Sequence, residues 1–164
     1  MRQFVFRGKT IKGSRWIYGD LFRTSGNTGD GIAIQYFDKV DGWMYYDIRA
    51  TTIGQFTGLY DKNETPVYEG DVLHVIEWEN LLFKEFSDDN NRFNLFTLEE
   101  IKGKIEKEYT SPVFWDEGGF CIGSSPGDKD VPLCCLFGDI KRSSPIFDFE
   151  IIGNIYDNPE LIKK

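Results

Sequence analysis

The side chains that could perform acid–base or nucleophilic chemistry are few in this sequence. His74 is the single histidine, which removes most catalytic and metal-binding arrangements that need an imidazole. On a strand predicted over residues 72–78, His74 shares a face with Val72, Ile76 and Trp78. This position favours a histidine packed in the core, so we expect no catalytic role for it.

The available thiols are Cys121, Cys134 and Cys135, and none has a histidine near it in the sequence. A cysteine nucleophile needs a base or an electropositive setting to form a thiolate. We therefore expect three small apolar side chains packed in strands. An odd number of cysteines, two of them adjacent, lacks the paired spacing of a disulfide framework or a zinc site. The pattern favours a reducing cytoplasm and no metal.

Two acidic pairs, Asp88-Asp89 and Glu99-Glu100, could in principle bind a hard cation or serve acid–base chemistry. The first lies in a polar segment, and the second lies in the first turn of a predicted helix, where acidic residues favour the helix dipole. No phosphate-binding loop or dinucleotide fingerprint is present. The sequence thus predicts no enzyme, no catalytic residues and no cofactor.

Basic and aromatic residues gather near the N-terminal end of the chain. Residues 1–19 contain five basic residues and no acidic one, although the whole chain has a formal net charge of −8. The candidate residues for binding an anionic ligand are Arg7, Lys9, Lys12, Arg15 and Trp16. Cations beside stacking surfaces are how small β-barrels hold single-stranded nucleic acid. The alternative, which we favour, is an amphipathic hairpin with a core of aromatic residues and basic residues that pair with the protein's own carboxylates.

Most of the elements that would position these residues are predicted to be strands. Aromatic residues make up 16% of the chain, which also has 17 glycines, and apolar residues alternate between turn signals. The strands are expected at 4–7, 15–18, 32–37, 43–48, 55–60, 72–78, 112–115, 119–122, 133–137 and 147–156. Turns are expected at 38–42 and 61–64, which are rich in aspartate, asparagine and glycine.

One segment departs from the strand pattern. Thr97 followed by Glu100 forms a capping box, and apolar residues recur at helical spacing from Leu98 to Tyr109. The spacing predicts an α-helix over 97–108. No apolar run is long enough for a membrane span, and the first residues alternate instead of forming a signal peptide. We therefore expect a cytoplasmic protein with no membrane partner.

Three stretches along the chain are more specific than any of these patterns. They are residues 15–21 (RWIYGDL), 53–63 (IGQFTGLYDKN) continuing into 67–73 (VYEGDVL), and 149–161 (FEIIGNIYDNPEL). Together they resemble the YopX-like family, a group of small proteins associated with bacteriophages and prophages. The resemblance spans 1–164 as a single unit, with 79–107 as an insertion. Two packed subdomains meeting near residue 60 remain an alternative.

The resemblance implies a mainly β fold with a small barrel, SH3-like or related, built from hairpins with one inserted helix. It also implies a gene carried by a mobile element, but no reaction and no site residues. Two positions depart from the family's pattern. Glu64 stands where a turn glycine is usual. Ala50-Thr51-Thr52 replaces the Asp-Pro-containing segment that usually leads into the Gly-Gln-Phe-Thr-Gly run. Both departures concern the local geometry of turns.

The absence of a catalytic set favours a non-enzymatic interaction or assembly module. Its partner would be another protein or a second copy, because exposed strand edges can pair with another chain. The first alternative is nucleic-acid binding through the basic N-terminal segment. The second is an acidic decoy or inhibitor of a basic partner, since residues 20–164 hold all 27 acidic residues.

Overall fold

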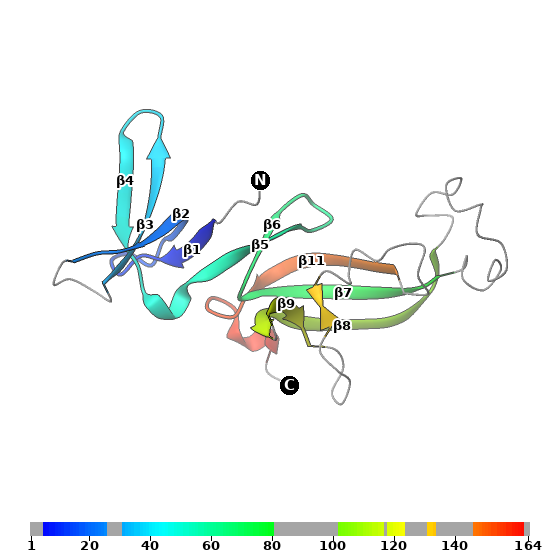
Figure 1. Cartoon of the computed structure of the whole chain (residues 1–164). Helices are drawn as coiled ribbons and strands as arrows, with labels where there is room; N and C mark the ends of the chain where they lie inside the picture. Colours follow the sequence, from blue (N-terminus) through cyan, green and yellow to red (C-terminus); the bar gives the residue numbers. More distant parts are fainter. Residues whose placement is uncertain are drawn as a thin grey trace. The chain divides into compact units, whose positions relative to one another are not determined.

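The computed structural model describes residues 5–25, 31–80, 102–116, 118–123, 131–133 and 146–162. Antiparallel strands dominate these residues (Figure 1), so the predicted mainly β class is confirmed. The chain divides into two compact units. Unit 1 comprises Met1–Tyr60 and Glu64–Gly70, and unit 2 comprises Asp61–Asn63 and Asp71–Lys164.

Unit 1 is built on one antiparallel sheet with the strand order β4-β3-β2-β1-β5-β6. The elements are β1 (Phe6–Lys9), β2 (Trp16–Arg23), β3 (Ile32–Asp38), β4 (Gly42–Asp47), the 3-10 turn η1 (Ala50–Thr52), β5 (Gly54–Tyr60) and β6 (Pro66–Tyr68). Alternating apolar residues place Ile17, Ile34 and Ile48 together on one side of the sheet, where they are buried. Six partly buried apolar side chains pack around them: Phe6, Leu21, Ile32, Tyr36, Tyr46 and Ile53.

Strand β2 changes its partner at Gly19. Residues Trp16 to Gly19 pair with β1, whereas Asp20 to Arg23 pair with β3. A Cβ atom on Gly19 would collide with the backbone oxygen of Gln35. Glycine is therefore required at this position, because it permits the close approach of β3 to β2.

The barrel predicted for the fold is not closed in the part of the chain that the structure describes. Strands β4 and β6 lie at the two ends of the strand order, so the sheet has two edges. One isolated bridge, between Thr10 and Ile48, links the segments that follow β1 and β4. The Ile11 amide donates to the Asp47 carbonyl and the Arg49 amide to the Lys9 carbonyl beside this bridge, but β4 does not pair with β1 along its length.

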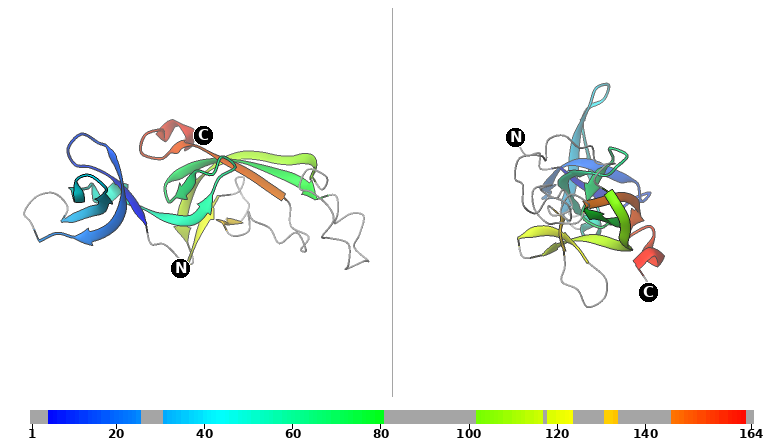
Figure 2. Two further views of the ribbon diagram at one scale, coloured as in Figure 1. Left: turned by 90° about the horizontal axis from the view of Figure 1, so that it is seen from above. Right: turned by 90° about the vertical axis from the view of Figure 1, so that its right-hand side faces the viewer.

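Unit 2 contains a second antiparallel sheet, with the order β10-β9-β8-β7-β11. Its elements are β7 (Asp71–Asn80), β8 (Lys102–Asp116), β9 (Gly119–Ile122), β10 (Val131–Pro132), β11 (Ile146–Asn154) and the 3-10 turn η3 (Pro159–Ile162). Figure 2 shows the long strands β7, β8 and β11 from two further directions. Buried residues on one side of this sheet include Leu73, Val75, Ser111, Val113 and Phe149.

The helix predicted over 97–108 is wrong for its described part, since Lys102 onward belongs to strand β8. Ile105 lies opposite Trp78, and Tyr109 lies opposite Val75, in the ladder between β7 and β8. The apolar residues that we predicted to form one face of a helix are therefore strand residues paired with β7. Gly103 also falls inside the predicted helix, where a glycine costs about 1 kcal/mol relative to alanine.

The turn predicted at 61–64 is confirmed for Asp61, whose carboxylate accepts hydrogen bonds from the Asn63 amide (2.9 Å) and the Ile151 amide (3.1 Å). The Lys62 amide donates to the Phe149 carbonyl at 3.2 Å. Strand β11 is at the end of its sheet, so Asp61–Asn63 supplies hydrogen-bond partners along its outer side. The segment protects this edge from pairing with another chain.

Several predictions concern residues outside the described ranges. These are Asp88-Asp89, Glu99-Glu100, Cys134, Cys135, the end of the strand expected at 133–137 and the interior of the insertion expected at 79–107. Inside the boundaries of this segment, Asn80 of β7 lies opposite Lys102 of β8. Cys121 is buried in β9, as predicted for a packed cysteine.

Candidate functional site

The residues predicted to bind an anion lie on and beside the hairpin formed by β1 and β2. In its register Arg7 lies opposite Tyr18, and Lys9 lies opposite Trp16. The guanidinium of Arg7 is 4.8 Å from the centroid of the Trp16 ring, and the Lys9 ammonium is 5.4 Å from the same ring. Both cations are thus held by cation–π contacts to an aromatic strand.

Arg7 is mainly a structural residue. Only 5% of it is exposed, and its Nη2 donates a hydrogen bond to the Glu69 carbonyl at 3.0 Å. Its guanidinium also lies 5.2 Å from the centroid of the Tyr68 ring. These contacts join the β1–β2 hairpin to β6 and its flanking residue. They leave Arg7 little surface with which to contact a ligand.

Arg15 belongs to the opposite side of the sheet. Its guanidinium lies 5.0 Å from the centroid of the Tyr46 ring, which stacks with Tyr36 at a centroid distance of 6.2 Å. Lys12 is exposed in the turn after β1, and its carbonyl accepts a hydrogen bond from the Thr10 hydroxyl at 2.7 Å. The structure therefore brings Arg7, Lys9 and Trp16 together and separates them from Arg15 and Lys12.

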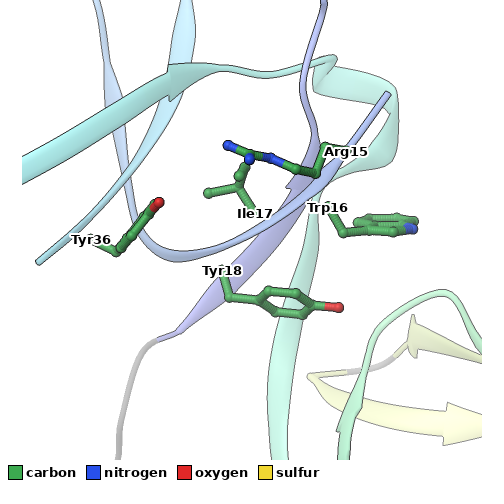
Figure 3. Close-up of a pocket in the computed structure, with 5 residues that line it drawn as sticks. All are labelled: Arg15, Trp16, Ile17, Tyr18 and Tyr36. Carbon is green, nitrogen blue, oxygen red and sulfur yellow. The ribbon is translucent and has the colours of Figure 1, made fainter. Parts of the chain in front are cut away.

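A shallow depression of about 380 Å³ crosses β2 near its start. It is lined by Arg15, Trp16, Ile17, Tyr18 and Tyr36. In Figure 3 the guanidinium of Arg15 and the hydroxyl of Tyr36 point toward one another, whereas the rings of Trp16 and Tyr18 extend in the opposite direction. Desolvation, followed by a hydrogen bond with Tyr46, raises the pKa of Tyr36. The depression offers one cation, two hydroxyls and three aromatic rings.

A second surface lies on the hairpin formed by β3 and β4. Phe37, Trp43 and Tyr45 are 61%, 63% and 70% exposed, and we call these three residues the hairpin patch. Phe37 and Trp43 are directly opposite in the ladder, and their rings meet edge to face at a centroid distance of 5.5 Å. Exposed aromatic residues gathered in this way mark interaction sites more often than single apolar residues do.

Sequence reasoning missed the hairpin patch because it predicted strands at 32–37 and 43–48 without asking which of their aromatic residues would be exposed. The available signal was the run Trp43-Met44-Tyr45-Tyr46, in which both alternating sets are apolar. A strand with two apolar faces must bury both faces or leave one exposed. In β4 the side chain of Tyr46 packs against the core, while Trp43 and Tyr45 remain exposed.

The backbone of β4 adds hydrogen-bonding groups to this surface. The Ile48 amide donates to the Ile32 carbonyl at 3.1 Å, and this bond fixes the alternation of the β3–β4 ladder. Residues 43, 45 and 47 consequently direct their N–H and C=O groups away from β3. The Asp47 carbonyl confirms the direction, since it accepts a hydrogen bond from the Ile11 amide at 3.1 Å. Among the described strands, none pairs with the outer side of β4.

In unit 2, the predicted core position of His74 is wrong, because its side chain is 25% exposed between two carboxylates. Its Nε2 is 2.8 Å from Glu108 Oε1, and its Nδ1 is 3.6 Å from Glu150 Oε1. The Lys62 ammonium lies 2.6 Å from Glu150 Oε2. Lys62 and His74 hold the pKa of Glu150 below its usual range, with the Lys62 hydrogen bond as the first cause. His74 therefore belongs to a surface network of charged side chains with Glu108, Glu150 and Lys62.

Two kinds of site are missing from the residues that the structure describes. They contain no cluster of three or more histidine, cysteine, aspartate or glutamate side chains suited to a metal ion. None of their helices has the length and apolar character that crossing a membrane requires.

The comparisons with known proteins bear on the family to which the chain belongs. A crystal structure of protein EF1440 from Enterococcus faecalis is similar to this chain with a TM-score of 0.49 and 18% sequence identity, covering 99% of this chain and 100% of that one. None of the curated proteins compared with the sequence matches it. The model of the family described as YopX protein matches residues 5–163, which is nearly the whole sequence. The chain therefore belongs to the YopX protein family.

Proposed function

We propose that this protein is a non-enzymatic interaction module that binds an extended segment of a partner protein along the outer side of β4. The observation that carries the proposal is the hairpin patch, with side chains 61–70% exposed beside a strand that ends its sheet. An added strand would bond to the outward backbone groups of Trp43 and Tyr45 and cover their rings. Strand addition uses both features, because the backbone gives affinity and the side chains give specificity.

A displayed library of random peptides would test this proposal on the full chain. The expected result is a set of peptides whose binding is lost in Trp43→Ala and kept in Trp115→Ala. Trp115 is a matched control, since it is also half exposed (50%) but lies in unit 2. Selection of no peptide, or equal binding to both variants, would refute the proposal.

A proline variant tests whether the backbone of β4 takes part. The Tyr45 amide points away from β3, so Tyr45→Pro removes no hydrogen bond from the β3–β4 ladder. Tyr45→Ala removes the same ring and keeps the amide. Selected peptides should bind Tyr45→Pro more weakly than Tyr45→Ala, with both variants folded by circular dichroism. Equal affinities would show that the peptide contacts side chains alone.

Single-stranded nucleic acid is a second candidate ligand, favoured by the depression that Arg15, Trp16, Tyr18 and Tyr36 line. Arg15 would contact a phosphate, and the aromatic rings would stack on bases. Fluorescence anisotropy with labelled DNA and RNA, at low and physiological salt, tests this candidate. Arg15→Gln should weaken binding and reduce its salt dependence, whereas Arg23→Gln, an exposed arginine outside the depression, should not. Absence of binding by wild type would discard it.

A further inference from the structure

We propose that the segment bound on β4 is basic, with Arg or Lys at alternate positions that lie over Trp43 and Tyr45. This inference rests on the proposed function and specifies the chemistry of the partner. It comes from a comparison inside unit 1. The pattern Trp-x-Tyr occurs twice, as Trp16-Ile17-Tyr18 in β2 and as Trp43-Met44-Tyr45 in β4.

The first copy of the pattern shows how this sheet covers a Trp-x-Tyr strand. Strand β1 lies against it with Arg7 opposite Tyr18 and Lys9 opposite Trp16. The two cations lie 4.8 and 5.4 Å from the centroid of the Trp16 ring. The covering strand therefore has the pattern Arg-x-Lys, since residues two apart in a strand share one face.

The second copy is paired on one side with β3, which places Phe37 opposite Trp43 and Gln35 opposite Tyr45 and so supplies no cation. No described strand lies on its outer side. Its outward backbone groups would hydrogen-bond to an added strand, so directly opposite side chains would lie about 5.5 Å apart at their Cβ atoms. Arg and Lys side chains are long enough to reach across the rings at that spacing. A basic strand would then repeat on β4 the contacts that β1 makes on β2.

The charge around the hairpin patch favours a cation. The β3–β4 hairpin contains three aspartates, Asp38, Asp41 and Asp47, and a single basic residue, Lys39. Asp20 of β2 adds another carboxylate, and its cross-strand neighbour Gln35 lies opposite Tyr45. Hydrogen bonds from the Val40 and Asp41 amides lower the pKa of Asp38, which keeps that carboxylate charged.

The same charges disfavour a second copy as the occupant. Two chains with a formal net charge of −8 repel one another, and the Arg-x-Lys strand of a second copy is already bounded by β2 and β5. The occupant that complements the patch is thus a basic segment of a different protein.

Four blocked synthetic peptides separate charge from backbone pairing. The first is Thr-Arg-Thr-Lys-Thr-Arg-Thr, with all three cations on one face of a strand. The second, Thr-Thr-Arg-Lys-Arg-Thr-Thr, has the same composition but places its central lysine on the other face. The third and fourth replace each cation of the first by Gln or by Glu. Binding is measured by ¹H–¹⁵N NMR titration of the full chain at low and physiological salt.

The alternating basic peptide should bind about tenfold more tightly than the Gln peptide, because each cation gains an aromatic contact. It should bind more tightly than its clustered isomer, weaken with salt and shift the amides of Trp43 and Tyr45. Trp43→Ala should abolish this preference, and Trp115→Ala should keep it.

Three outcomes would overturn the inference. Equal binding of the basic and Gln peptides at the patch would do so while leaving the proposed interaction module intact. Basic peptides that bind equally well to Trp43→Ala would place the site elsewhere. Self-association in light scattering that is lost in Trp43→Ala would make a second copy the occupant. Failure of every peptide, including those selected from the library, would count against the proposed function itself.

Discussion

Trp16 and Trp43 begin the same three-residue pattern in neighbouring parts of one sheet, but their surroundings differ. Cations from β1 lie over Trp16, whereas Trp43 is 63% exposed on a strand that ends the sheet. The difference comes from the residues of the neighbouring strand. Strand β1 places Lys9 and Arg7 opposite the first pattern, whereas β3 places Phe37 and Gln35 opposite the second. The pattern in β2 contributes to stability, and the pattern in β4 is the surface that we propose for binding.

Removing Arg7 should have the largest effect on this comparison. Arg7→Ala loses the hydrogen bond to the Glu69 carbonyl and two aromatic contacts in a buried site. We expect a loss of about 2–4 kcal/mol in the free energy of unfolding. Chemical denaturation followed by tryptophan fluorescence measures it. Lys9→Ala is the control and should lose less than about 1 kcal/mol; equal losses would contradict the structural role of Arg7.

Replacing the two tryptophans tests the comparison directly. Trp16→Ala should cost about 1.5–3 kcal/mol of unfolding free energy, because its ring is partly buried beneath two cations. Trp43→Ala should change it by about 0.5 kcal/mol or less, since the side chain is mostly exposed. Thermal and chemical unfolding of both variants would check this. A comparable loss in the two variants would mean that the hairpin patch holds the fold together.

A smaller effect is expected at the turn that precedes β6. Glu64 has a φ of +60°, in the left-handed region that favours glycine. The resemblance to the YopX-like family implies a turn glycine at this position. Glu64→Gly should raise the free energy of unfolding by up to about 1 kcal/mol. Glu64→Ala keeps the Cβ and removes the charge, so it should give no such gain. A gain in both variants would point to charge instead of backbone strain.

The smallest expected effect on stability is in the surface network of unit 2, where exposed charges pair with one another. The pKa of Glu150 is lowered in the folded state, so its contribution is present above the pKa of an ordinary glutamate and is lost as pH falls through the folded value. Lys62→Met should raise the pKa of Glu150 in carboxyl-carbon NMR titrations. Lys39→Met, in unit 1, should leave it unchanged.

Alternating patterns predicted most of the strands, because each buries one face and the period of two is visible in a single sequence. The helix prediction failed at Ile105 and Tyr109, whose spacing of four fits both a helical stripe and one face of a strand. Only the pairing of this segment with β7 decides between a helix and a strand. Barrel closure failed for a related reason, since the pairing of β1 with β5 cannot be read from either strand alone.

The candidate site was predicted in part. The sequence indicated that Arg7, Lys9 and Trp16 belong to one hairpin, and their contacts bear this grouping out. It could not indicate that Arg7 reaches the Glu69 carbonyl, 62 positions away, or that Arg15 lies over Tyr46. Nor could it identify β4 as an edge. These features depend on strand order and register, which local patterns leave open.

The segment Asp61–Asn63 has a consequence for the order in which the protein is completed during synthesis. The Asp61 carboxylate accepts a hydrogen bond from the Ile151 amide, 90 positions later in the chain. Every strand of unit 1 has been made by Tyr68, so its sheet can form while the ribosome still holds the rest. The polar groups of Asp61 and Lys62 that bond to β11 remain solvated until β11 has been synthesised. The last long strand to be synthesised is therefore the one that fixes a segment made in the first half of the chain.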